Sequence, residues 1–182
     1  MRHNLDTLVA AIEDCRDQKR ILPSLILLYS GIDIVGSLEQ APGEPAGAGF
    51  RRWATRYVLS NSRIDCSADD LWGARCAIVH TYTAESEVVR SGRAKQVFYT
   101  WGTANVADLA DMTKAIGRDN VALHINDVVL AFKRGVSKFL LELASDPARL
   151  SAASERAGLW FTNLDESIGD RFLRLTGRKP DV

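Results

Sequence analysis

Apolar residues recur at helical spacing along most of the chain. Positions three and four apart predict a first helix over about residues 4–20: Leu5, Leu8, Val9, Ile12 and Cys15. Residues 23–39 are apolar on nearly every side, and Pro23 suits a first helical turn. We therefore expect this second helix at the centre of a bundle, where Gly31 and Gly36 allow neighbouring helices to approach closely.

The next segments also read as helices. Residues 41–49 have the composition of a loop, and an aromatic segment with an apolar face follows at 50–59. Ser67 is a good N-cap for a further helix that runs to about residue 82. Asp69 and Asp70 fall in its first turn, where negative charge is favourable, and this explains them better than a metal site does.

The pattern changes after residue 93. Residues 95–101 and 120–125 are rich in β-branched and aromatic or other apolar side chains, so each is predicted to form a short strand. A short helix is expected between them, and the strands can pair into a small ribbon. Asn126 is the expected cap of a long helix over about 127–146, followed by a less regular amphipathic tail.

These elements predict a mainly α fold, a helical bundle with a small two-stranded β-ribbon insertion. At 182 residues the chain is expected to be a single domain over residues 1–182. Its bundle core would cover about 4–82 and 120–146. The β-containing insertion would span about 93–125, and a C-terminal helical extension about 148–177.

Charge and cysteine content narrow the function. Lys plus Arg and Asp plus Glu are both 23, so a protein that coats nucleic acid non-specifically is excluded and any contact with nucleic acid must be local. Three irregularly spaced cysteines indicate reduced thiols rather than a disulfide framework. The N-terminus lacks the apolar region of a signal peptide, and Pro23 and Asp33 interrupt the most apolar stretch. We expect a cytoplasmic protein with no membrane partner.

Standard nucleotide-binding, zinc-protease and serine-hydrolase motifs do not occur in the sequence. The residues of interest are Arg75 and His80, near the end of the helix that Ser67 caps. Five helical steps place them about 140° apart, yet the length of the arginine lets both border one cleft. A histidine at a helix C-terminus is also favourable for stability alone.

The segment from Arg75 to His80 resembles the RxxxxH motif of the HEPN superfamily of helical nucleotide-binding domains. The resemblance covers residues 5–82 well and 120–146 loosely, with the strands as an insertion. It implies a metal-independent endoribonuclease that works as a homodimer, needs no cofactor, and leaves a 2′,3′-cyclic phosphate and a 5′-hydroxyl. In that role Arg75 binds the scissile phosphate, and His80 transfers protons as an acid or base.

Further residues are assigned through the same resemblance. Asp33 is the expected supporting acid, although it can equally be a salt-bridged core residue. Cys76 stands where active members often carry a polar residue. Flanking cations are expected to steer RNA or a nucleotide phosphate, unless they only solvate the surface: Arg51, Arg52 and Arg56.

Three functions remain open from the sequence. The first is the endoribonuclease, which can be a toxin or defence effector with an antitoxin or regulatory partner. The second is a non-catalytic HEPN-like module that binds a nucleotide or RNA, or only dimerises, which Cys76 and the neutral charge favour. The third is a helical scaffold or regulator with an added β-ribbon.

Overall fold

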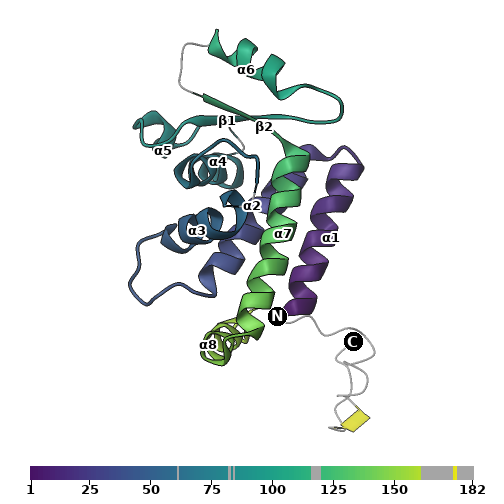
Figure 1. The fold of residues 1–182 in the computed structure, drawn as a ribbon, viewed down its shortest axis with the longest axis vertical. Coiled ribbons are helices and arrows are strands. Elements are labelled where there is room, and N and C mark those ends of the chain that lie inside the picture. Colours follow the sequence, from purple (N-terminus) through teal and green to yellow (C-terminus); the bar gives the residue numbers. More distant parts are fainter. Residues whose placement is uncertain (61, 82, 84, 116–119, 161–173, 176–182) are drawn as a thin grey trace.

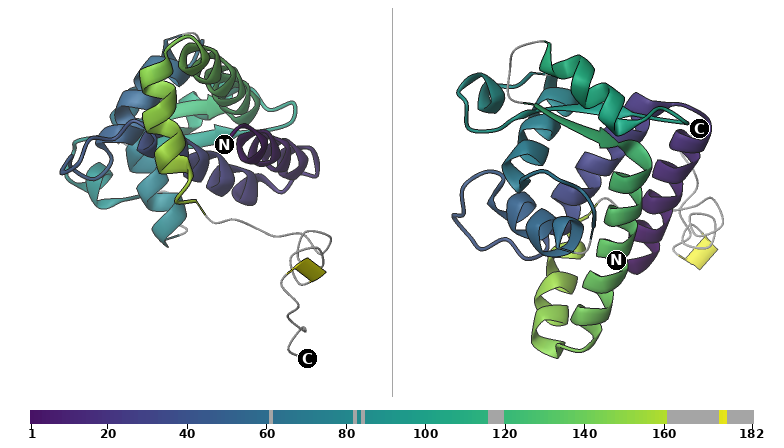
Figure 2. Two further views of the ribbon diagram at one scale, coloured as in Figure 1. Left: turned by 90° about the horizontal axis from the view of Figure 1, so that it is seen from below. Right: turned by 45° about the horizontal axis from the view of Figure 1, so that its top comes forward.

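A computed structural model describes residues 1–60, 62–81, 83, 85–115, 120–160 and 174–175. Its helices pack side by side, with a pair of short strands across one end (Figures 1 and 2). The bundle consists of α1 (Arg2–Asp17), α2 (Ile21–Ser37), α3 (Ala48–Trp53) with its π-helical continuation η1 (Ala54–Leu59), α4 (Ala68–Thr81), α7 (Ile125–Ala144) and α8 (Pro147–Ala157). This confirms the mainly α fold class with a small two-stranded sheet.

Helix α2 lies at the centre of the bundle, as its apolar sequence predicts. It contacts α1, α3, α4 and α7. Pro23 lies in its first turn, where the missing backbone N–H costs no helical hydrogen bond. Its apolar side chains are buried on several faces: Leu25, Leu28, Tyr29, Ile32 and Val35.

Glycines allow the neighbouring helices to pack closely against α2. A Cβ atom at Gly36 would lie 2.8 Å from the carbonyl carbon of Gly49 in α3, which is nearer than Cβ atoms approach such a group. A Cβ atom at Gly31 would similarly lie 2.7 Å from Cζ of Phe132 in α7. The predicted role of Gly31 and Gly36 in close helix packing is therefore confirmed.

The two strands belong to a β–α–β unit. Strands β1 (Gln96–Thr100) and β2 (Asn120–His124) are parallel, with Gln96 opposite Asn120 and Thr100 opposite His124. Parallel neighbours cannot be joined by a tight turn, and α6 (Val106–Lys114) lies in the connection. Because β2 leads directly into α7, the sheet is attached to the bundle at that point.

A buried carboxylate fixes the start of β1 against α4. The Ser67 hydroxyl accepts a hydrogen bond from the backbone N–H of Asp70, and the Asp70 carboxylate accepts one from the N–H of Ser67. The other carboxylate oxygen of Asp70 accepts the N–H of Lys95, at 2.6 Å. Ser67 is thus the cap that the sequence predicts, and Asp70 also holds the β-containing unit to the helix.

The expected cap of the long helix is wrong. His124, rather than Asn126, caps α7, and its Nδ1 accepts the backbone N–H of Asn126 at 3.2 Å. Its Nε2 lies 3.2 Å from the carbonyl oxygen of Gly102, which can only accept, so Nε2 carries the ring proton. Asn126 is the better cap by propensity, but the strand ends in a histidine whose ring nitrogen reaches the same donor.

The expected C-terminal extension is seen in part. Helix α8 begins beside Asp146, whose carboxylate accepts the backbone N–H of Arg149. The remainder of the extension, expected to about residue 177, lies outside the described residues except for 174–175. Within the described chain, no helix has both the length and the apolar composition needed to cross a bilayer.

Candidate functional site

An ion pair links the central helix to the helix that carries the predicted motif. Nε and Nη2 of Arg75 on α4 lie 2.6 and 2.5 Å from one carboxylate oxygen of Asp33 on α2. The two side chains are 17% and 29% exposed, respectively. A carboxylate this shielded inside an apolar helix needs a partner, and the structure provides Arg75.

The same guanidinium reaches His80. Nη1 of Arg75 lies 2.5 Å from Nε2 of His80. Because a guanidinium only donates, Nε2 of His80 is the acceptor in this contact. The long arginine side chain spans the five-residue offset between the two positions. Asp33, Arg75 and His80 therefore form one connected chain of charged and polar groups.

An indole ring supports the guanidinium. Cζ of Arg75 lies 5.1 Å from the centroid of the Trp72 ring, and Cζ of Arg51 lies 5.0 Å from it. Arg51 also donates from Nε to a carboxylate oxygen of Asp69 at 2.6 Å. The structure thus brings Arg51 to the same ring as Arg75.

Asp69 lies in the first turn of α4, as the sequence predicts, and Trp72 packs against the hydrophobic core. Both side chains also contact the arginines, since Asp69 pairs with Arg51 and the Trp72 ring lies beside Arg51 and Arg75. The signal was present in the spacing, because Asp69, Trp72 and Arg75 are three residues apart and so share one face of α4. The spacing alone could not show that Arg51 lies beside this face, because Arg51 belongs to a different helix, α3.

Cys76 lies beside this chain of groups. Burial raises the pKa of its thiol above the usual value, and the neighbouring Arg75 partly offsets the rise. Cys76 and exposed His80 line a surface cavity of about 340 Å³ with residues of the α4–α5 connection and of α5 (Glu87–Arg90). The imidazole therefore faces a space that a ligand can enter.

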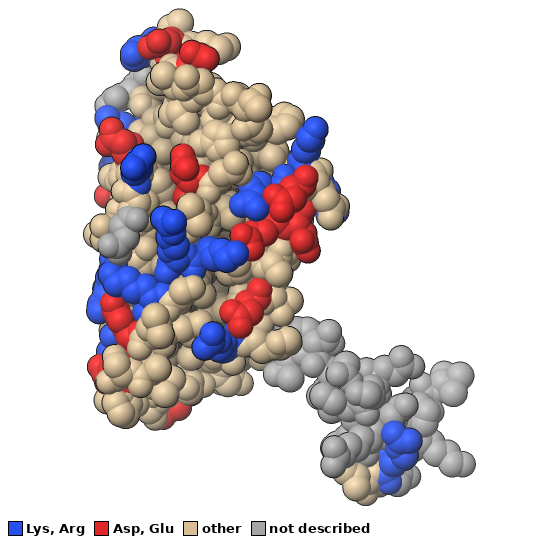
Figure 3. Space-filling view, turned by 45° about the vertical axis from the view of Figure 1, so that its right-hand side comes forward, with Lys and Arg blue, Asp and Glu red and all other residues tan. Residues whose placement is uncertain are grey.

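Two of the predicted RNA-binding cations form ion pairs elsewhere. Arg52 pairs with Glu44, with Nη1 and a carboxylate oxygen 2.8 Å apart, and Arg56 pairs with Glu142 on α7 at 2.7 Å. Basic and acidic side chains are likewise interspersed over the face shown in Figure 3. The described hydrogen bonds and ion pairs of Arg52 and Arg56 thus run to Glu39, Glu44 and Glu142 rather than to Asp33, Arg75 or His80.

In the described part of the chain, no three His, Cys, Asp or Glu side chains gather where they can hold a metal ion. Comparisons with protein-family models, with curated proteins and with solved structures find no match.

Proposed function

We propose that this protein is a HEPN-like endoribonuclease that acts as a dimer and cleaves RNA without a metal ion. The observation that supports the proposal is the connected chain Asp33–Arg75–His80. In this chain a cation suited to phosphate lies beside an imidazole that lines a surface cavity. These are the two groups that an internal attack by the ribose 2′-hydroxyl requires.

The proposed reaction uses each group at a defined atom. His80 takes the proton of the 2′-hydroxyl on Nε2, once the substrate replaces Nη1 of Arg75 as its partner. The 2′ oxygen then attacks phosphorus, and the bond from phosphorus to the 5′ oxygen breaks. Arg75 stabilises the charge that develops on the phosphate oxygens. The products are a 2′,3′-cyclic phosphate and a 5′-hydroxyl.

The dimer supplies the second proton transfer. With two copies facing each other, His80 of the partner subunit in its protonated form gives a proton to the leaving 5′ oxygen. Sedimentation or light scattering of the wild-type protein tests this part of the proposal, because a strictly monomeric protein contradicts it.

The deciding experiment is cleavage of a mixed single-stranded RNA in EDTA by wild-type protein, His80→Ala and Arg75→Ala. Loss of the acid–base group is expected to slow cleavage by about 10²- to 10⁴-fold. His3→Ala and Arg134→Ala are matched controls, since both residues are exposed and lie outside the site. Cyclic phosphate ends from wild type and both controls, but not from the site variants, support the proposal. Equal cleavage by His80→Ala contradicts it.

A second function is favoured by one observation. Nε, Nη1 and Nη2 of Arg75 all face partners within the chain, so an RNA phosphate competes with Asp33 and His80 for this cation. This arrangement suits a non-catalytic module that binds RNA or a nucleotide, or one that only dimerises. In that case folded wild type and His80→Ala bind labelled RNA equally and neither cuts it.

A further inference from the structure

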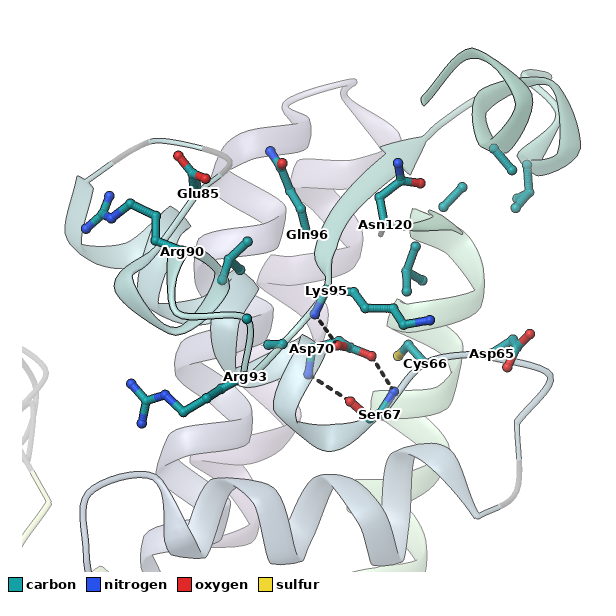
Figure 4. A pocket seen from close by; sticks show the side chains of 17 residues that line it. Asp65, Cys66, Ser67, Asp70, Glu85, Arg90, Arg93, Lys95, Gln96 and Asn120 are labelled. Carbon is teal, nitrogen blue, oxygen red and sulfur yellow. Dashed lines mark hydrogen bonds between the residues drawn. The ribbon is translucent and has the colours of Figure 1, made fainter. Parts of the chain in front are cut away.

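A second cavity, of about 1220 Å³, lies between α4, α5, the two strands and α6 (Figure 4). It is larger than the roughly 300–1,000 Å³ typical of small-ligand pockets. Glu85 and Arg90 line both this cavity and the one beside His80. The two cavities are therefore neighbours that share part of their lining.

The wall of the large cavity combines cations with apolar side chains. Arg90, Arg93 and Lys95 are exposed, and the amide of Gln96 extends from β1 into the same region (Figure 4). Apolar side chains from α5, α6 and β2 form much of the remaining wall: Val89, Val106, Ala110, Val121 and Ala122. Exposed cations can contact the phosphates of a single strand, and the aliphatic side chains give its bases an apolar surface whose described residues include no aromatic ring.

The acidic residues of the cavity differ in position and exposure. Asp70 is 4% exposed, and its two oxygens accept the backbone N–H groups of Ser67 and Lys95. Asp65 and Glu85 lie at opposite margins of the view in Figure 4. Arg90 forms an ion pair with Glu87, with Nη2 and a carboxylate oxygen 2.9 Å apart, so a phosphate in this cavity would contact Arg93 and Lys95 rather than Arg90.

We propose that this cavity holds the nucleotides that flank the scissile phosphate of a single-stranded RNA. Their bases lie against the apolar wall, and their phosphates contact Arg93 and Lys95. A duplex fits less well, because its base faces are stacked and hidden. The inference rests on the proposed function of Arg75 and His80, and it makes the β-containing unit a substrate-positioning element.

The test measures RNA binding by the His80→Ala protein, which holds substrate without cutting it. Fluorescence anisotropy compares a labelled dinucleotide with a longer single strand, over a range of salt concentrations. Arg93→Ala/Lys95→Ala is the test variant, and Arg2→Ala/Arg134→Ala removes the same charge from exposed positions on α1 and α7. Arg90 is left intact because it also borders the cavity of His80.

Losing two phosphate contacts is expected to reduce the salt slope of binding to the longer strand by about 1.4, at about 0.7 per contact. The preference for the longer strand over the dinucleotide falls as well, whereas the control keeps both. Arg93→Lys/Lys95→Arg preserves the charge and keeps the slope. An unchanged slope in the test variant, or an equal loss in the charge-preserving variant, overturns the inference.

The two proposals fail differently. If wild type cuts RNA but the Arg93→Ala/Lys95→Ala variant binds the longer strand like the control, the active site stands and the flanking subsite does not. If the variant loses affinity for the dinucleotide as much as for the longer strand, the cations act at the scissile site and the subsite is again overturned. If neither wild type nor His80→Ala binds RNA, both proposals fall.

Discussion

Asp33 and Arg75 form an ion pair across the α2–α4 contact in which one carboxylate oxygen receives both Nε and Nη2 of the guanidinium. This use of two donors fixes the plane of the guanidinium as well as its position. Nη1 is thereby directed to Nε2 of His80. The acid on the central helix is thus a positioning residue for the proposed catalytic pair.

The first prediction concerns this ion pair. Asp33→Ala is expected to lower the free energy of unfolding by about 1–3 kcal/mol, because it leaves a largely buried cation without its carboxylate. Arg75→Ala in the Asp33→Ala background should then cost less than it does in wild type. Urea unfolding of the two single variants and the double variant measures the coupling. Additive losses would show that the pair contributes no interaction energy.

The second prediction separates backbone strain from contact with Trp72. Gly43 and Gly47 both have a φ of +79°, but a Cβ atom at Gly47 would lie 2.6 Å from the Trp72 ring, whereas one at Gly43 has nothing within 4 Å. Both alanine variants are expected to lose about 1–2 kcal/mol from the left-handed conformation. Gly47→Ala should lose more and should change Trp72 fluorescence relative to Gly43→Ala. Equal losses of stability in the two variants, with unchanged fluorescence spectra, would contradict the prediction.

The third prediction concerns the contact between α2 of the bundle and β1 of the sheet. The hydroxyl groups of Tyr29 on α2 and Tyr99 on β1 hydrogen-bond to each other. Tyr99→Phe is expected to cost about 1–3 kcal/mol, because the fully buried Tyr29 hydroxyl loses its partner. The double variant Tyr29→Phe/Tyr99→Phe should cost less than the sum of the single variants. Thermal or urea unfolding of the four proteins tests this, and a double variant at or beyond the sum contradicts it.

Local pattern was enough to predict much of the fold. The apolar periodicity identified the central helix, and β-branched and aromatic residues identified both strands, because these signals depend on neighbours in the sequence. The parallel arrangement of the strands did not follow from their composition. The His124 cap was missed because a ring nitrogen in this position has no strong sequence preference.

The candidate site was predictable to a smaller extent. Arg75, His80 and Asp33 were each named from spacing or from an isolated charge, and the structure brings them together. Trp72 and Asp69 share a helix face with Arg75, but their link to Arg51 depends on the packing of α3 against α4. The pairing of Arg52 and Arg56 with distant acids depends on tertiary structure in the same way.

The last prediction concerns alkaline pH. Burial raises the pKa of the Cys66 thiol from its usual 9.0 to about 12, and the nearby Asp70 and Asp65 add to the rise. Burial also raises the pKa of the Tyr29 and Tyr99 hydroxyls. The folded protein therefore keeps protons that the unfolded chain releases, so stability is full below about pH 9 and falls as the pH rises toward 12.

The Cys66 thiol lowers the free energy of unfolding by at most about 1.4 kcal/mol for each pH unit in this range. Between about pH 9 and 10 this loss of stability comes from Cys66 rather than from the tyrosines, because tyrosines in the unfolded chain begin to ionise only near pH 10. Urea unfolding of wild type and Cys66→Ala across this interval measures the difference in slope. The slopes matter here rather than the absolute values, because removing the partly buried thiol also changes packing. A wild-type slope no steeper than that of Cys66→Ala would show that the folded protein does not protect this thiol from ionisation.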